Sequence, residues 1–235
     1  MSVAFRMEPA TDAERIGTAA FVLSLRGRGV SDTAVLRALE TVPRDFFAPR
    51  RFADLSRSDV ALPLACGQTM TAPATVAQML VALQVQPGQR VLEIGTGSGY
   101  VTALLARLGG QVRSVERRSV LSEGASRRLE AAGLADSVEL VDGDGLEGLA
   151  DDTHYDRILL NGVVPVVPSA LTSRLLVGGR LVGATATSGA PRLLIITRGI
   201  DGSLAHTVGA ALRLSPLVTG DAARPKSPAL NGCLT

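Results

Sequence analysis

One short segment of this 235-residue chain constrains its fold more than any other: Glu93-Ile-Gly95-Thr-Gly97-Ser-Gly99-Tyr100. It follows an apolar run at residues 90–94, typical of a buried strand, and precedes a run with helical spacing at residues 100–108. Three glycines between a strand and a helix let the backbone approach a ligand closely at the carboxyl edge of a sheet. The segment therefore predicts a strand–loop–helix unit that binds a ligand.

The chain from about residue 85 onward alternates between strand and helix patterns. This alternation predicts an α/β fold with a mostly parallel sheet and helices on both faces. The last two strands are expected to pair around the turn at Asp201-Gly202, which makes the C-terminal strand antiparallel. The expected strands are 90–94, 111–115, 138–141, 155–160, 180–182, 193–197 and 210–214, and the expected helices are 100–108, 119–132 and 170–176.

Composition and the spacing of apolar residues divide the chain into three predicted segments. Residues 1–60 predict an N-terminal helical cap, with one helix over residues 11–28, for which Thr11 is a possible cap, and a second opened by Asp32. Residues 61–218 predict the ligand-binding domain. Residues 219–235 are polar with two prolines and are expected to form a loose tail.

The residues next to the three glycines indicate which class of ligand the loop binds. A dinucleotide fingerprint, GxGxxG, requires glycine at position 100, where this chain has Tyr100. Glu93, two residues before the first glycine, suits an ammonium group better than a pyrophosphate. S-adenosylmethionine has a zwitterionic amino-acid end, a cationic sulfur and no phosphate, so it is the expected ligand.

Two further acids follow the next strands. Glu116 lies 21 residues beyond Gly95 at the tip of a strand, where a carboxylate can accept both ribose hydroxyls. Asp144, in Asp142-Gly-Asp144-Gly145, can accept from an adenine amino group. Two plainer interpretations stay open at this stage: a solvated acid at a strand end for Glu116, and ordinary Asp-Gly turn chemistry for Asp144.

Composition excludes several classes of protein. The 24 Lys and Arg against 22 Asp and Glu, with two Tyr and no Trp, predict that nucleic acid is not a partner. Cys66 and Cys233 are far apart, which argues against a disulfide framework or a metal site and favours a reducing compartment. The apolar stretch at residues 19–25 is too short to span a membrane. We therefore expect a cytoplasmic protein with no membrane partner and no metal.

Several segments together resemble a known family. Val91-Leu-Glu-Ile-Gly-Thr-Gly-Ser-Gly-Tyr100 resembles motif I of the class I methyltransferases, which have a Rossmann-like fold. The resemblance is specifically to the protein-L-isoaspartate O-methyltransferase family and covers roughly residues 35–215. It is carried by Val42-Pro-Arg-Asp-Phe-Phe47, by Leu62-Pro-Leu-Ala-Cys-Gly-Gln-Thr-Met-Thr-Ala-Pro73 (the specific part, similar to PLP-x-x-x-GQT-I-S-x-P), by Val141-Asp-Gly-Asp-Gly145, and by segments 165–171 and 176–181.

The resemblance implies methyl transfer from S-adenosylmethionine to the α-carboxyl group of L-isoaspartyl residues in damaged proteins or peptides. Thr71 stands where the family has a serine whose hydroxyl contacts the reacting carboxylate, so it is the predicted catalytic residue; a helix N-cap before Pro73 is the alternative. The predicted cofactor-binding residues are Gln68, Thr69, Glu93, Gly95, Gly97, Ser98, Gly99, Glu116, Asp144 and Gly145.

The chain departs from the family pattern after the fourth strand. It has Leu160-Asn-Gly-Val-Val-Pro165 where the family usually has T-A-A-A-P, so Val163 and Val164 are expected to narrow the cleft that receives the substrate. Two alternatives follow: a divergent enzyme that methylates another carboxylate substrate, and a non-catalytic cofactor-binding scaffold. The sequence leaves the oligomeric state open.

Overall fold

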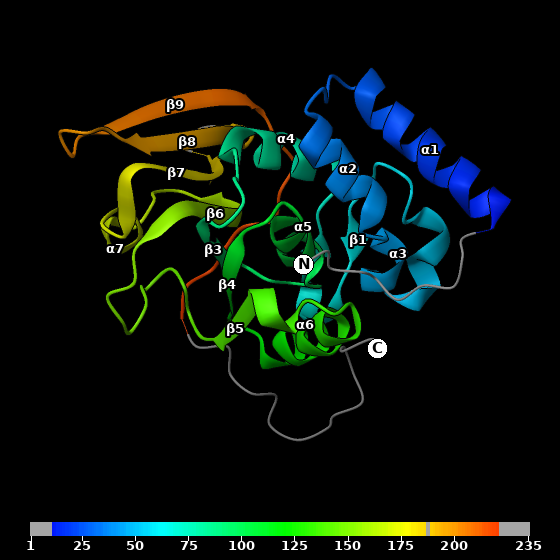
Figure 1. Cartoon of the computed structure of the whole chain (residues 1–235). Helices are drawn as coiled ribbons and strands as arrows, with labels where there is room; N and C mark the ends of the chain where they lie inside the picture. Colours follow the sequence, from blue (N-terminus) through cyan, green and yellow to red (C-terminus); the bar gives the residue numbers. More distant parts are fainter. Residues whose placement is uncertain (1–10, 187–188, 221–235) are drawn as a thin grey trace.

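The structure is a computed structural model that describes residues 11–186 and 189–220 (Figure 1). Its N-terminal part is helical, and both expected caps form. Thr11 and Glu14 make a reciprocal capping box, and the Asp32 carboxylate accepts a hydrogen bond from Val35 N at 2.9 Å. The elements of this part are α1 (Asp12–Gly27), α2 (Thr33–Thr41), α3 (Arg44–Phe47) and the 3-10 helix η1 (Arg50–Leu55).

A short hairpin and a helix join this part to the main sheet. Strand β1 (Leu62–Pro63) pairs antiparallel with β2 (Thr69–Met70) around the 3-10 turn η2 (Ala65–Gly67). Helix α4 (Pro73–Leu83) follows at once, and Pro73 occupies its first turn, where a missing N–H costs nothing.

The main sheet has seven strands in the order β5-β4-β3-β6-β7-β8-β9. The first five strands in this order, from β5 through β4, β3 and β6 to β7, run parallel to one another. Strand β8 runs antiparallel to both of its neighbours, β7 and β9. The predicted fold class is thereby confirmed. The strands are β3 (Arg90–Ile94), β4 (Gln111–Glu116), β5 (Val138–Asp142), β6 (Tyr155–Val164), β7 (Leu175–Thr185), β8 (Arg192–Arg198) and β9 (Leu204–Ala211), and the remaining helices are α5 (Tyr100–Arg107), α6 (Ser119–Ala131), η3 (Ala135–Ser137) and α7 (Ser169–Thr172).

Two apolar cores lie on the two faces of this sheet, and helices cover them unequally. On one face α4, α5 and α6 pack on alternate strand residues such as Val91 and Val182. On the other face Leu92 and Leu181 belong to a core that α7 and the loop that contains Leu146 help to cover. The N-terminal helices share the first core, because their buried side chains join the same cluster; the division at residues 60 and 61 stays a prediction.

The structure corrects several predicted bounds. The last strand runs over 204–211 instead of 210–214, because the turn at Asp201-Gly202 is tight and places Leu204 opposite Arg198. This edge strand is mostly exposed, so it lacks the alternating apolar pattern that identifies a strand. The strand that starts at Tyr155 extends past Leu160 to Val164, β7 is longer than 180–182, and α7 ends before residue 176.

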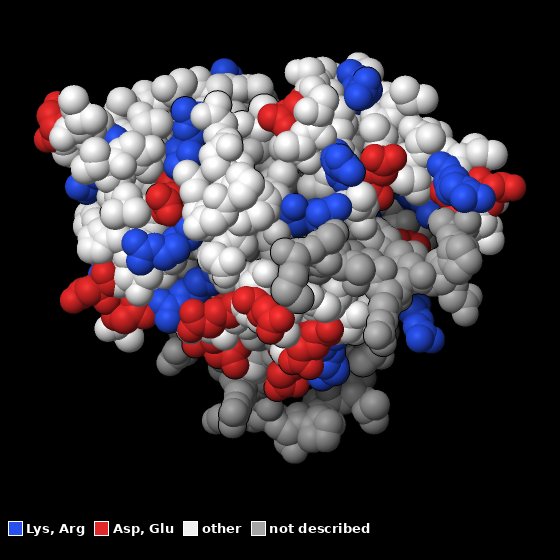
Figure 2. All heavy atoms as spheres, in the orientation of Figure 1, with Lys and Arg blue, Asp and Glu red and all other residues white. Residues whose placement is uncertain are grey.

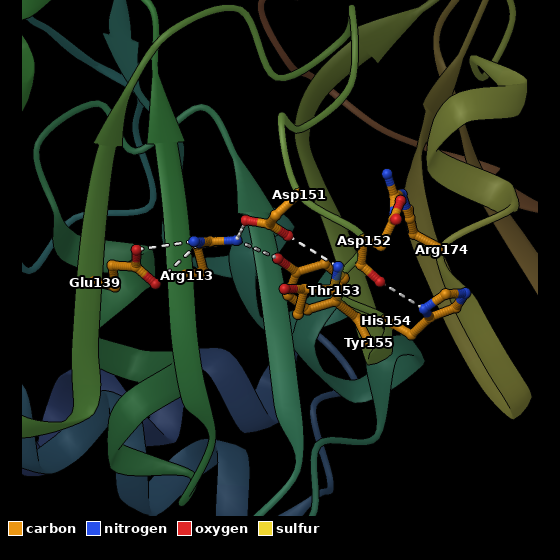
Figure 3. A network of polar contacts seen from close by, with 8 residues as sticks. All are labelled: Arg113, Glu139, Asp151, Asp152, Thr153, His154, Tyr155 and Arg174. Atoms are coloured by element: carbon orange, nitrogen blue, oxygen red, sulfur yellow. Dashed lines mark hydrogen bonds and ion pairs between the residues drawn. The ribbon is translucent and has the colours of Figure 1, made fainter.

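The loop between β5 and β6 is fastened by polar contacts (Figure 3). Arg113 on β4 donates to both carboxylate oxygens of Glu139 and also to Asp151 and the Tyr155 hydroxyl. His154 contacts the backbone oxygen of Asp152 through Nδ1. These contacts tie the loop to β4 and β5 and include the first of the chain's two histidines.

Charges are mixed on the visible surface. On the face shown in Figure 2, basic side chains are scattered among uncharged and acidic ones, and acidic side chains gather toward the bottom of the view. That view covers one face, so the absence of a nucleic-acid partner stays a prediction. None of the helices in the described ranges is long and apolar enough to cross a bilayer.

Candidate functional site

A cleft opens at the carboxyl ends of the parallel strands, where the sheet order reverses. From β3 the chain proceeds to β4 on one side, while β6 pairs with the other edge of β3. Such a switch point is where open α/β sheets bind ligands. The lining comes from six places along the chain: 68–71, the glycine loop with the start of α5, 115–118 with Leu121, 143–146, Asn161, and 215–218.

The glycine loop adopts backbone conformations that other residues rarely tolerate. Gly95, Gly97 and Gly99 have φ angles of +96°, +57° and +85°. At Gly99 an added Cβ would also lie 3.2 Å from Cβ of Ala125 on α6. Ser98 lines the cleft and accepts a long hydrogen bond from Tyr100 N at 3.3 Å. The predicted strand–loop–helix unit is therefore present, with α5 starting directly after Gly99.

Glu116 ends β4 with its carboxylate in the cleft. Oε2 accepts from Gly97 N at 2.9 Å and Oε1 accepts from Arg118 N at 2.8 Å. An ionised carboxylate offers about four acceptor positions, so both oxygens keep capacity for hydroxyl donors. The side chain is only 7% exposed, which contradicts the interpretation as a solvated acid at a strand end.

Asp144 lines the cleft from the loop after β5. Oδ1 accepts from Leu146 N at 2.9 Å, the Asx-turn contact that the plainer interpretation predicts. Oδ2 accepts from Gly220 N at 2.5 Å, which ties the C-terminal segment to this loop. The next residue, Gly145, packs so closely that an added Cβ would lie 2.4 Å from Cδ1 of Ile94.

Glu93 does not line the cleft. Its side chain is 0% exposed and faces α5, where Thr102 Oγ1 donates to Oε2 at 2.5 Å. Ser114 Oγ on β4 donates to the same oxygen at 2.7 Å, and Asn161 Nδ2 on β6 lies 3.4 Å from Oε1. Burial raises the pKa of Glu93 to about 7 against the lowering effect of these hydrogen bonds. The expected direct contact with an ammonium group is therefore absent from this geometry.

The hairpin loop before α4 brings Gln68, Thr69 and Thr71 to the cleft. The N-cap of α4 is Ala72, which makes no side-chain cap, and Asp59 Oδ1 instead accepts from Ala74 N at 2.8 Å. Thr71 therefore does not cap the helix, and its hydroxyl takes no hydrogen bond within the described residues. Thr69 Oγ1 lies 2.7 Å from Ser215 Oγ, and Gln68 Nε2 donates to the Cys66 carbonyl at 3.3 Å.

The structure buries Val163 and Val164 instead of exposing them to a substrate. They are 8% and 1% exposed, belong to different apolar cores, and are not among the residues that line the cleft. The reason is the extra length of β6, which carries both valines within the sheet. The two valines therefore do not line this cleft, and their effect on the substrate stays a prediction.

Most of the lining residues that the sequence did not single out are neighbours of predicted site residues, but Asn161 and residues 215–218 come from parts of the chain where no site residue was predicted to contact the cofactor. Asn161 Nδ2 donates to the Gly95 carbonyl at 3.1 Å. Val163 N donates to Ser215 O at 3.0 Å and Leu217 N donates to Val163 O at 2.9 Å, which docks this segment against β6. No local sequence pattern predicts a contact between residues so far apart. Asn161 alone had a usable signal, because it directly follows the strand predicted at residues 155–160, whose carboxyl end belongs to the ligand-binding edge of the sheet.

The fold and the site together define a Rossmann-like class I methyltransferase: a glycine loop after the first strand of the parallel sheet, and an acid after each of the next two. Comparisons with known proteins give the family. The profile described as Protein-L-isoaspartate(D-aspartate) O-methyltransferase (PCMT) matches residues 17–222, so the chain belongs to that family.

Relatives and solved structures agree with this assignment. The chain is 44% identical over 216 residues to the protein-L-isoaspartate O-methyltransferase of Azorhizobium caulinodans, covering 91% of this chain and 98% of the relative. It resembles a solved protein-L-isoaspartate O-methyltransferase with a TM-score of 0.74 at 26% identity, covering 86% of this chain and 66% of that one. A Plasmodium falciparum structure, titled a putative protein-L-isoaspartate O-methyltransferase in complex with S-adenosyl-L-homocysteine, gives a TM-score of 0.75 at 19% identity (85% of this chain, 97% of that one) and supports the fold.

The described part of the chain has no group of side chains that could form a metal-binding site. Within residues 11–186 and 189–220, no three His, Cys, Asp or Glu side chains gather closely enough to hold a metal ion.

Proposed function

We propose that this chain is an S-adenosylmethionine-dependent methyltransferase that acts on the α-carboxyl group of L-isoaspartyl residues in damaged proteins or peptides. Its membership of the family supports the proposal. The observation that carries it is the position of Thr71, which lines the same cleft as Glu116 and Asp144 while Asp59 caps the helix that Thr71 would otherwise cap.

The cleft has a donor set that fits this cofactor. The carboxylates of Glu116 and Asp144 favour hydroxyl and amino donors and repel phosphate, as a phosphate-free nucleoside requires. The lining residues that would hold it are Gln68, Thr69, Gly95, Gly97, Ser98, Glu116, Asp144 and Gly145. Gly99 does not line the cleft; it ends the loop at the start of α5, against Ala125. When bound, S-adenosylmethionine supplies a methyl group activated by a cationic sulfur. Glu93 would act from beneath the loop, through Asn161 and the backbone of Gly95.

The protein itself has to supply alignment more than proton transfer. An acceptor carboxylate is already ionised at neutral pH, so no general base is needed. Neither histidine lines the cleft: His154 belongs to the loop network and His206 lies exposed on β9. The Thr71 hydroxyl would donate to one oxygen of the acceptor carboxylate and so orient the other oxygen for in-line attack on the methyl carbon.

Methyl transfer from tritiated cofactor tests the proposal. We expect labelling of an isoaspartyl peptide and none of its aspartyl isomer. Thr71→Ser should retain activity, whereas Thr71→Val, which keeps the shape but lacks the donor, should lower kcat/KM about 10- to 100-fold, as loss of a hydrogen bond to a charged group predicts. Calorimetry with S-adenosylhomocysteine should give the same affinity for both variants. Bound cofactor without turnover of the isoaspartyl peptide would contradict the proposal and favour another carboxylate substrate or a scaffold.

An isoaspartyl-containing protein or peptide is the partner proposed here, and the cytoplasm is the proposed location. The sequence supports this location because Cys66 and Cys233 are the only cysteines and offer no disulfide framework.

A further inference from the structure

The side chain of Arg44, at the start of α3, connects three separate pieces of backbone. It is 4% exposed. Nη1 donates to Ser56 O at 3.1 Å, and Nη2 donates to Val60 O at 2.9 Å and to Thr71 O at 3.1 Å. A planar guanidinium presents its donors in a fixed fork, so the three carbonyls are held in one geometry.

This guanidinium is buried without a carboxylate partner. Among the described residues no acid forms an ion pair with Arg44, and burial lowers the pKa of Arg44 against the opposing effects of Tyr100 and Asp59. An unpaired buried charge is costly unless its hydrogen bonds are made. The three backbone carbonyls bind the two Nη atoms, while the buried Nε has no hydrogen-bond partner among the described residues. The three carbonyls are therefore the only groups of the described chain that bind this charge by hydrogen bonds, and their positions and that of the charge depend on each other.

One of those carbonyls belongs to the residue with the proposed role in methyl transfer. Two contacts fix the backbone at Thr71: Arg44 binds its carbonyl oxygen, and Asp59 binds Ala74 N, three residues further along in the first turn of α4. The helix that carries Arg44 also reaches the cleft wall, because the rings of Phe47 and Tyr100 lie 5.9 Å apart and Tyr100 lines the cleft.

We propose that Arg44 is a positioning residue for methyl transfer: by binding the Thr71 carbonyl it fixes the backbone from which the Thr71 hydroxyl meets the acceptor carboxylate. This inference rests on the proposed function. Arg44 makes no hydrogen bond to the glycine loop, to Glu116 or to Asp144, so its loss acts on the loop that carries Thr71 and leaves that part of the cofactor site in place.

Three variants test the inference. Arg44→Lys keeps the charge but replaces the planar fork, whose two Nη atoms share the three carbonyls, with a single nitrogen on a shorter side chain. Arg44→Ala leaves a space that methylguanidinium can occupy. The matched control is Arg180→Ala. It removes a hydrogen bond from Arg180 Nη1 to the backbone oxygen of Ala82, 2.9 Å long, near the C-terminal end of α4 and away from the cleft.

Kinetics and calorimetry give the first readout. We expect Arg44→Lys to lower kcat at least tenfold at saturating isoaspartyl peptide, since small displacements of positioned groups cost up to about a hundredfold in rate. The affinity for S-adenosylhomocysteine should stay within about threefold. Arg180→Ala should keep kcat, and methylguanidinium should restore part of the activity of Arg44→Ala. Equal kcat values for Arg44→Lys and Arg180→Ala would overturn the inference, as would a parallel loss of cofactor affinity.

Hydrogen exchange gives a readout that needs no activity. Amides of residues 68–72 should exchange at least tenfold faster in Arg44→Lys than in the unaltered protein, while amides of α5 should not change. If the unaltered protein methylates no isoaspartyl peptide, the proposed function fails, and this exchange experiment still decides whether Arg44 holds the Thr71 backbone. Unchanged exchange at 68–72 refutes that hold; if Arg44→Ala does not fold, Arg44→Lys decides alone.

Discussion

Replacing Glu93 with glutamine should stabilise the protein above pH 7 and flatten the pH dependence of its unfolding. Burial raises the pKa of this fully enclosed carboxyl from 4.5 to about 7, against hydrogen bonds from Thr102 and Ser114. The folded chain therefore holds the proton more tightly than the unfolded chain. The resulting contribution to stability is fully present below pH 4.5 and is lost as pH rises through 7.

The size of the effect follows from the two pKa values. A carboxyl whose pKa rises from 4.5 to about 7 on folding loses about 3 kcal/mol of stabilisation when it is ionised in both states. Most of that loss, about 2.5 kcal/mol, falls between pH 5 and pH 8 by the same linkage relation. Glutamine keeps the shape and an acceptor oxygen for the two hydroxyls but carries no charge, so it removes this pH dependence.

Urea unfolding of both proteins across this pH range measures the difference. The free energy of unfolding of Glu93→Gln, minus that of the unaltered protein, should grow by about 2 to 3 kcal/mol from pH 5 to pH 8. Exposed Glu40 provides the control, because Glu40→Gln also removes one carboxyl but leaves the core intact. Parallel curves for Glu93→Gln and the unaltered protein would show that Glu93 is ionised throughout and would refute the argument.

Three other changes have defined outcomes. Glu116→Gln removes the charge from an acid whose two oxygens face the cleft, and calorimetry should show S-adenosylhomocysteine binding weakened at least tenfold, as expected for hydrogen bonds to a charged group. Val163→Ala with Val164→Ala should cost about 2 kcal/mol for each buried valine and give no gain in isoaspartyl methylation; a gain would restore the cleft-narrowing hypothesis. Asp59→Ala should lower the free energy of unfolding by about 1 kcal/mol through the lost cap of α4, and an unchanged melting curve would count against that cap.

Local chemistry explains why much of this molecule could be predicted from its sequence. The strand, three glycines and helix around Gly97 lie within about 20 residues, and each signal concerns neighbours along the chain. The caps at Thr11 and Asp32 are similarly local, since each side chain binds an amide three residues ahead. The acids Glu116 and Asp144 were found because parallel strands end at a common edge.

Contacts between distant residues could not be predicted in this way. Asp59 caps α4 although it lies 15 residues before the amide that it binds. From the sequence alone, Thr71 was the candidate cap because it stands just before Pro73. The segment at 215–218 lines the cleft because its backbone pairs with Val163, and the sequence of the segment itself does not indicate that partner. Strand β9 was misplaced for a related reason: its edge position exposes most of its side chains and removes the apolar alternation.

Glu93 shows how strand geometry decides the role of a residue that motif spacing alone leaves open. Side chains along a strand alternate between faces, and Leu92 and Ile94 both enter the core beneath α7. Glu93 must then face the opposite side, toward Thr102 on α5, whatever ligand the loop binds. From there its carboxylate contacts β4 through Ser114 and β6 through Asn161, whose amide also holds the Gly95 carbonyl. An acid two residues before the first glycine therefore joins three strands and the loop from beneath the cleft.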